Sequence, residues 1–118
     1  MTEDGCLFCR IILGQLPAEF VYEDELVVAF RDIQPMAPVH VLVVPRIHIA
    51  NAGSLGSNDA EILLAMFLSA KVVAEHEGIN DPDRGWRLVF NVGPDALNSV
   101  AHLHLHILGG RKMTGSLA

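Results

Sequence analysis

Residues 102–110 read HLHLHILGG, which places histidine at every second position and ends in two glycines. Successive residues of a β-strand face opposite sides of the sheet, so His102, His104 and His106 are predicted to share one side, while the apolar residues between them pack on the other. At a rise of about 3.3 Å per residue, the outer two histidines lie roughly 13 Å apart. A zinc ion needs its nitrogen ligands within about 2.1 Å, so a straight strand cannot easily bring all three rings to one metal. The spacing therefore indicates separate tasks along a line.

Attack on phosphorus is one task that suits such a row. A neutral imidazole is a good nucleophile near neutral pH, because its unperturbed pKa is about 6.5. It can form a phosphohistidine intermediate that water later cleaves, while a neighbouring imidazole binds the phosphoryl oxygens and helps to protonate the leaving group. The alternative is a solvated row of histidines with no chemical role. We favour phosphoryl chemistry because strict alternation on an apolar backing is hard to assign to chance.

The rest of the chain predicts an α+β fold in which this strand belongs to a mostly antiparallel, five-stranded sheet. Apolar runs bounded by proline, glycine and acidic turns indicate the strands, and two segments indicate helices. The predicted elements are a short N-terminal helix from Cys6 to Leu13, a hairpin with strands ending near Tyr22 and running from Leu26 to Phe30, a strand between Pro38 and Pro45, one long helix capped by Asn58 with Glu61 and ending near Glu77, and strands at 86–92 and 100–108.

The long helix also predicts a partner. Residues 62–68, ILLAMFL, contain no polar side chain, although a helix that rests on one sheet needs only one apolar stripe. A second side is therefore expected to be buried as well. A homodimer is the simplest arrangement that would cover it.

Composition excludes several classes of function. With 118 residues and a hydrophobic content of 51%, the chain is expected to form a single domain over 1–118. A net charge of −6 argues against a nucleic-acid partner, although it permits a small phosphorylated ligand. The apolar run at 62–68 is too short to cross a membrane, and the start, MTEDG, lacks the basic region of a secretory signal. We therefore expect a cytoplasmic protein without a membrane partner.

Cys6 and Cys9 form a Cys-x-x-Cys pair at the predicted short helix. In a protein that is not exported, this spacing indicates a metal or redox pair more than a structural disulfide. It is a common half of a zinc site, with two histidines as the other half. Two reduced, half-buried cysteines are the main alternative. A redox pair is less favoured because the thioredoxin-like strand before the motif is missing.

The histidine row also matches a known pattern. HLHLHIL fits His-x-His-x-His-x-x with apolar x, the motif that names the histidine triad (HIT) family. The resemblance runs from CLFCRII (6–12) through YEDELVVAFRDIQPMAPVHVLVVPRIHI (22–49) to GGRKM (109–113), and includes the segment NSV before the triad. The chain most resembles the HINT branch of purine nucleoside phosphoramidases and related bacterial HIT proteins. A HIT-like fold and a homodimer are therefore implied.

This resemblance implies roles for single residues. His104 would attack the α-phosphate, His106 would contact the phosphate and the departing group, and His102 completes the triad. His40 matches a further family histidine beside the triad, and its alternative is a structural histidine at a strand start. Asp32 matches the carboxylate that holds the ribose hydroxyls, since one carboxylate can accept hydrogen bonds from both hydroxyls of a cis-diol. The alternative is an ordinary turn aspartate.

The remaining residues implied by the resemblance surround a purine nucleotide such as AMP, GMP or an adenosine derivative. Taken singly, each could be ordinary core or loop capping. The apolar walls of the purine slot are matched by Phe8, Ile11, Leu16, Phe30 and Ile33, and the polar groups near the phosphate by Asn91, Asn98 and Ser99.

Some bacterial HIT proteins with a Cys-x-x-Cys near their start carry a structural zinc. Their resemblance to this chain implies that His48 and His102 complete the site begun by Cys6 and Cys9. Zinc would then tie the N-terminal helix to the catalytic strand and contribute to folding.

Two departures from the HINT pattern bear on activity. The chain reads Leu97-Asn98 where Gly-Gln or a similar pair is usual, and leucine resists backbone angles that glycine allows. The end, GGRKMTGSLA, also lacks the Trp-Pro-Pro common in HINT relatives. The leading hypothesis is a hydrolase that releases an amine from the α-phosphate of a purine nucleotide through an AMP–His104 intermediate. The alternatives are a dinucleoside polyphosphate hydrolase of the same fold, and a non-catalytic nucleotide-binding or zinc-stabilised interaction protein.

Overall fold

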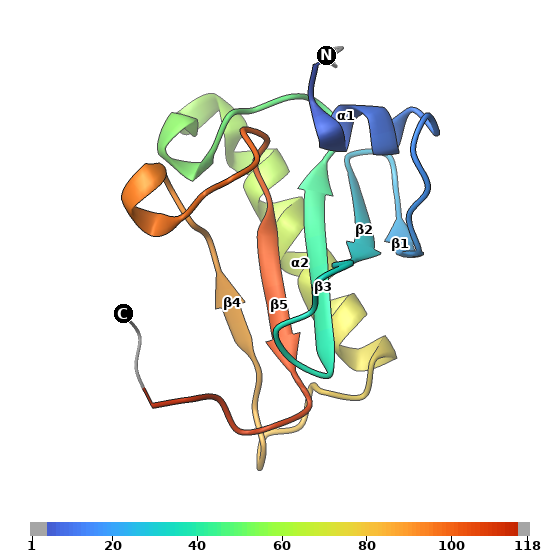
Figure 1. Cartoon of the computed structure of the whole chain (residues 1–118), viewed down its shortest axis with the longest axis vertical. Coiled ribbons are helices and arrows are strands. Elements are labelled where there is room, and N and C mark those ends of the chain that lie inside the picture. The colour runs from blue at the N-terminus through green and yellow to red at the C-terminus, as the bar shows by residue number, and fades with distance from the viewer. Residues whose placement is uncertain (1–4, 116–118) are drawn as a thin grey trace.

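The computed structural model describes residues 5–115 and forms a twisted antiparallel sheet with helices on both faces (Figure 1). Residues 1–4 lie outside the described part. They make up most of the segment MTEDG, from which we expected no secretory signal. The five strands follow the order β1-β2-β3-β5-β4. Their bounds are Phe20–Glu23 for β1, Val27–Arg31 for β2, Val39–Pro45 for β3, Arg87–Val89 for β4 and Leu105–Gly109 for β5, and the helices are α1 (Leu7–Ile12) and α2 (Ala60–His76). These elements confirm the predicted α+β architecture.

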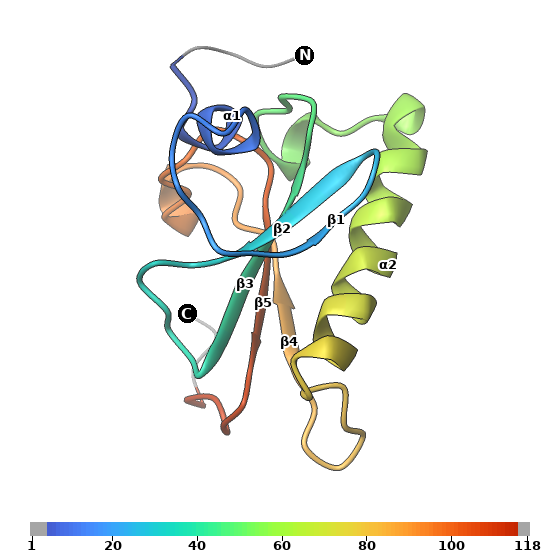
Figure 2. The ribbon, with the colours of Figure 1, turned by 90° about the vertical axis from the view of Figure 1, so that its right-hand side faces the viewer.

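The two faces of the sheet have different covers. Helix α2 lies along one face, and α1 crosses near one end of the other (Figure 2). Val27 and Ala29 of β2 pack in the cluster under α2, while Val28 and Phe30 pack in the smaller cluster under α1. Alternation along β2 therefore fills two cores.

The same alternation holds in the histidine-rich segment. Leu103, Leu105 and Ile107 belong to the α2 core, whereas the rings of His102 and His104 pack against Phe8 of α1 on the opposite face. The apolar residues thus anchor the segment, and the imidazoles face the shorter helix.

Strand β5 is shorter than expected, because it begins at Leu105 and the expected strand begins at residue 100. Its ladder with β3 starts at the pair Val43↔Leu105. Beyond this pair β3 ends at Pro45, which has no N–H to donate. Residues 100–104 leave the ladder, and the N–H of Leu103 bonds to the Ile49 oxygen at 2.6 Å instead. β4 is also shorter than the expected 86–92, and it pairs only with residues 106–108.

The long helix begins and ends close to its predicted limits. The expected cap at Asn58 was wrong: a 3-10 turn, Ser57–Asp59, precedes the helix, and the Asp59 carboxylate accepts the Gly56 N–H at 2.9 Å. The helix ends at His76, and Gly78 follows with a φ of 74°, a left-handed angle that suits glycine.

Helix α2 buries one side and exposes the other. Met66, Ala70 and Val73 are in the core, whereas apolar side chains on the outer side are exposed, namely Leu64, Phe67, Leu68 and Val72. The apolar run at 62–68 is therefore only half covered by the chain itself. Within residues 5–115, no helix has the length and apolar character needed to cross a membrane.

Candidate active site

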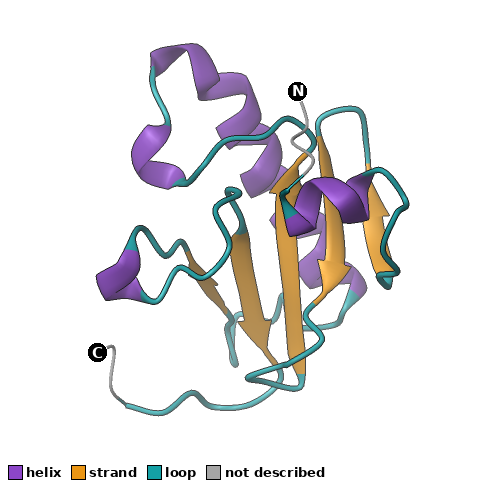
Figure 3. Cartoon of the chain, turned by 45° about the horizontal axis from the view of Figure 1, so that its top comes forward, coloured by secondary structure: helices purple, strands orange, loops and turns teal. Residues whose placement is uncertain are grey.

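A cavity of about 850 Å³ lies on the α1 side of the sheet. It is bounded by α1, by β2 with the loop that follows it, and by the segment that leads from β4 into β5. Figure 3 shows α1 on the β2 side and the helical turn Pro94–Ala96 on the β4 side, with β3 and β5 between them. The residues that the sequence analysis expected here and that line the cavity are Phe8, Ile11, Leu16, Phe30, Asp32, Ile33, His40, Ser99, His104 and His106.

Three expected residues do not line the cavity. Asn91 lies beside His106, with its side-chain amide group 3.5 Å from Nε2 of that ring. Asn98 has a buried side-chain oxygen without a hydrogen-bond partner among residues 5–115. His102 is fully buried and lies with the two cysteines.

Hydrogen bonding determines which nitrogen of His104 is free. Nδ1 lies 2.7 Å from the backbone oxygen of His102. A carbonyl oxygen can only accept, so Nδ1 carries the proton and the lone pair of the neutral ring resides on Nε2. Burial lowers the pKa of His104, because desolvation disfavours the charged ring. At neutral pH the site therefore holds an uncharged imidazole, and its lone pair is not used by that hydrogen bond.

A second chain of hydrogen bonds orients His106. The backbone N–H of Met36 donates to Nδ1 of His40 at 3.0 Å, so the proton of neutral His40 is on Nε2. That nitrogen lies 2.9 Å from Nδ1 of His106. His106 then accepts at Nδ1 and carries its own proton on Nε2. The ring centroid of His106 is 4.9 Å from that of His104, so a donor stands beside the nucleophilic ring.

The electrostatics keep this group of rings neutral. The pKa of His106 is lowered to about 4, mainly by burial and further by the neighbouring rings of His104 and His40. Burial also lowers the pKa of His40, and the Asp32 carboxylate opposes that effect. An anion bound in the cavity would favour the protonated rings.

Asp32 follows the end of β2 and forms part of a tight turn. Its Oδ1 accepts the N–H of Gln34 at 2.9 Å, and its Oδ2 lies 3.4 Å from Nε2 of His40. The carboxylate lines the cavity and retains acceptor capacity beyond these contacts. It can therefore accept hydrogen bonds from ligand hydroxyls.

The apolar end of the cavity is built from α1 and β2. The rings of Phe8 and Phe30 pack edge to face with centroids 5.5 Å apart, and both residues are buried. Ile11 lies in the same cluster, and Leu16 packs against it. These side chains form a wall of the kind that accepts a flat aromatic base. Ile33, by contrast, is exposed at the rim.

Cys6, Cys9, His48 and His102 form a separate cluster, with one donor atom of each within 4.8 Å of the others. The cysteines are not joined in a disulfide. Nδ1 of His102 lies 3.2 Å from Sγ of Cys6 and 3.4 Å from Sγ of Cys9, and Nδ1 of His48 lies 3.5 Å from Sγ of Cys9. Tetrahedral zinc places nitrogen and sulfur ligands about 3.5 Å apart. The cluster therefore has the donors and spacing of a zinc site.

The tautomer of His102 supports the same conclusion. Nε2 lies 2.9 Å from the backbone oxygen of Pro45 and must donate to it, so in the neutral ring the lone pair is on Nδ1, which faces the sulfurs. A backbone carbonyl commonly orients a metal-binding histidine in this way. Cys6 also caps α1, because its Sγ accepts the N–H of Cys9. The residues present therefore fit zinc.

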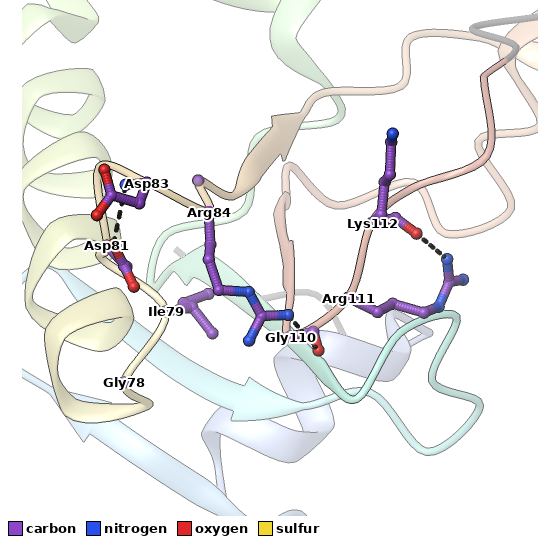
Figure 4. A pocket seen from close by; sticks show the side chains of 9 residues that line it. Gly78, Ile79, Asp81, Asp83, Arg84, Gly110, Arg111 and Lys112 are labelled. Carbon is purple, nitrogen blue, oxygen red and sulfur yellow. Dashed lines mark hydrogen bonds between the residues drawn. The ribbon is translucent and has the colours of Figure 1, made fainter.

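A second cavity, of about 420 Å³, lies at the far end of β5 (Figure 4). Its two arginine side chains bond to backbone oxygens of the chain itself. Arg84 donates to the Gly110 oxygen at 3.2 Å, and Arg111 donates to the oxygens of Lys112 and Met36 at 2.9 and 2.7 Å. The cavity contains none of the six histidines. Through Met36, however, Arg111 anchors the loop that orients His40.

Sequence reasoning missed the backbone groups that determine the tautomers. The carbonyls of His102 and Pro45 and the N–H of Met36 leave no signal in side-chain type. Leu97 was noted as a departure from the usual pattern, and the structure gives it a φ of 61°.

With this geometry established, comparison with known proteins identifies the family. A HIT domain model matches residues 14–113, and the chain belongs to the HIT family. It is 39% identical over 112 residues to the purine nucleoside phosphoramidase of Escherichia coli K12, covering 95% of this chain and 92% of that one. It is 45% identical over 115 residues to a 14 kDa zinc-binding protein of Zea mays, covering 96% and 88%.

A solved structure shows the same fold. A HIT family hydrolase from Clostridium thermocellum superposes with a TM-score of 0.93 at 44% identity, covering 99% of this chain and 100% of that one. This match confirms the HIT-like fold. Family and structural neighbour together place the chain among HIT proteins of the hydrolase type.

Proposed function

We propose that the protein hydrolyses the bond between the α-phosphate of a purine nucleotide and an amine, through a nucleotidyl–His104 intermediate. One observation carries the proposal. The His102 carbonyl occupies Nδ1 of His104, which leaves the Nε2 lone pair of a neutral, cavity-lining ring beside His106. The name of the Escherichia coli relative supports a phosphoramidase-type substrate.

Both chemical steps use the same two rings. Nε2 of His104 attacks phosphorus, and the phosphorus–nitrogen bond breaks. The bound phosphoryl anion favours protonated His106, which gives its Nε2 proton to the departing amine. Neutral His106 then takes a proton from water as the water oxygen attacks phosphorus. The bond to His104 breaks, and AMP or GMP leaves with His106 again protonated.

Other residues position the nucleotide. His40 orients His106 through the 2.9 Å contact, and Asp32 accepts the ribose hydroxyls. Ser99, which lines the cavity, donates to the phosphate, with Asn91 and Asn98 beside it. The base lies against the purine walls formed by Phe8, Ile11, Leu16, Phe30 and Ile33.

We also propose that Cys6, Cys9, His48 and His102 hold a structural zinc. Zinc supplies a cross-link between segments distant in sequence. Here the linked segments are α1, the loop after β3 and the start of the histidine row. The plant relative's name as a zinc-binding protein supports this assignment.

A homodimer is proposed from the outer side of α2. Leu64, Phe67 and Leu68 are exposed there, and the edge strand β4 lies at the end of the sheet. Apolar side chains gathered on one helix face are typical of an interface. We also propose that residues 1–118 of each subunit form a single domain.

The test is incubation with adenosine 5′-phosphoramidate and with the lysine amidate of AMP, followed by chromatography of the products. We expect AMP release by the wild type and none by His104→Ala. AMP binding without release would favour a nucleotide-binding protein. Faster release from diadenosine polyphosphates than from amidates would favour the polyphosphate hydrolase.

A further inference from the structure

Leu97 has an unusual conformation for a leucine. Its backbone is left-handed, with φ 61° and ψ 33°, and it is the one non-glycine residue with positive φ within 5–115. Such angles are unfavourable for a residue with a Cβ. A turn holds them, because the N–H of Leu97 donates to Pro94 at 3.0 Å and that of Asn98 to Gly93 at 3.2 Å. A strained residue held by its surroundings suggests a role in function.

Core packing does not explain why a leucine stands at position 97. Leu97 is 85% exposed, so its apolar surface contributes little to the core. It nevertheless lines the same cavity as His104 and His106. Met36, on the loop between β2 and β3, is 71% exposed and lines that cavity too. Two apolar side chains thus line the cavity although both are exposed to water, which is unfavourable for apolar surface.

The sheet order indicates what Leu97 faces. The cavity receives its apolar walls from α1 and β2, its histidines from β3 and β5, and Leu97 from the loop between β4 and β5. The helical turn Pro94–Ala96, just before Leu97, lies on the β4 side of the sheet (Figure 3). We infer that a nucleotide with its base against Phe30 and its phosphate at His104 directs its leaving group toward that side. The lining residues from that loop are Leu97, Ser99 and Val100, and none is charged.

We propose that Leu97 selects apolar amines as leaving groups. The inference rests on the proposed function and deepens it: the same phosphorus–nitrogen bond breaks, but amines with an alkyl or aryl side chain are preferred over amines that carry a charge. An apolar group covers Leu97 and gains by leaving water. A charged group meets no charged side chain among the residues of this loop that line the cavity, and it loses hydration.

Two AMP amidates of nearly equal shape test this selection. One has 4-methylbenzylamine as its leaving group, and the other has 4-(aminomethyl)benzoate, which replaces the methyl by a carboxylate. The wild type is expected to favour the methyl compound in kcat/KM by about tenfold. Leu97→Ala, which keeps the Cβ and the backbone strain, should reduce the preference to within about twofold. Leu97→Lys should reverse it.

Leu97→Gly separates the side chain from the backbone. If the side chain selects, Leu97→Gly and Leu97→Ala lose the preference equally. A preference that survives in Leu97→Ala and disappears only in Leu97→Gly would overturn the proposal, as would equal kcat/KM for both amidates in the wild type. Thermal melting confirms that each variant is folded.

Binding keeps this test independent of turnover. In the His104→Ala background both amidates stay intact, and calorimetry gives their affinities with and without the additional substitution Leu97→Ala. A preference for the methyl compound that depends on Leu97 supports the inference even if the wild type cleaves neither amidate, an outcome that would overturn the proposed function alone. Equal affinities of the two amidates with Leu97 present would contradict it.

Discussion

His102 and His104 are two residues apart on the same side of the chain, yet their rings are bound in opposite ways. In His102 a backbone carbonyl occupies Nε2, and Nδ1 faces two sulfurs. In His104 a carbonyl occupies Nδ1, and Nε2 is left for the cavity. A single hydrogen bond therefore determines whether an imidazole is prepared as a metal ligand or as a nucleophile.

Phe8 separates the two regions. Its ring packs edge to face on both imidazoles, with centroid distances of 6.0 Å to His102 and 5.1 Å to His104. His102 is fully enclosed, while His104 reaches the cavity. We therefore assign stability to His102 and chemistry to His104.

The largest effect is expected from His104→Ala. Removal of the nucleophile should lower kcat for an AMP amidate by at least about 10⁴-fold, since the remaining groups cannot form the covalent intermediate. Zinc content and melting temperature should stay close to those of the wild type, as measured by metal analysis and calorimetry. Loss of zinc in this variant would show that the two regions are not separate.

His106→Gln should have the next largest effect. The amide keeps an N–H donor but cannot transfer a proton, so cleavage of alkyl amidates should fall by about 10²- to 10³-fold. The p-nitrophenyl ester of AMP serves as the control, because its leaving group departs without a proton. The comparison uses the rate of formation of the intermediate in single-turnover assays, because the later attack of water is common to both substrates. Equal losses for amidate and ester in that first step would contradict proton transfer to the leaving amine.

Cys9→Ser is expected to act on stability. The variant should lose bound zinc and melt about 15 °C lower, because a free zinc concentration a thousand times the Kd stabilises the fold by about 4 kcal/mol. Chelation should lower the melting temperature of the wild type to a similar value and leave that of the variant unchanged. A zinc-free wild type, purified without chelator, would rule out the metal assignment.

The smallest effect is a dependence of stability on pH. The pKa of His106 is about 4 in the folded chain, mainly through burial, and about 6.5 when unfolded. The unfolded state therefore binds the proton first as pH falls, so this contribution is present above about pH 6.5 and is lost between about 6.5 and 4. Denaturant unfolding across that window should show a shallower pH dependence for His106→Gln than for wild type.

Much of this division could be predicted from the sequence. The alternation in residues 102–107 predicted which side chains share a face, and Cys6 and Cys9 predicted half of a metal cluster. The resemblance to the HIT family, not the spacing, singled out His48 and His102 as the other half. The tautomers could not be predicted, because they depend on main-chain groups of Pro45 and Met36 that only folding brings close.

The limits of the strands show the same difference between local and long-range causes. The start of the helix at Ala60 differs from the predicted cap by a single 3-10 turn. The start of β5 depends on Pro45, a residue of another strand, and was therefore missed by five residues. Local patterns predict an element, while its ends follow from its neighbours in space.

Trapping the intermediate tests the central claim most directly. Wild-type protein mixed in excess with an AMP amidate is quenched in alkali within one turnover, and the modified peptide is mapped by mass spectrometry. We predict a nucleotidyl group on His104, formed and lost at rates that match AMP release. AMP production without any adduct, or an adduct on His102 or His106, would contradict this claim.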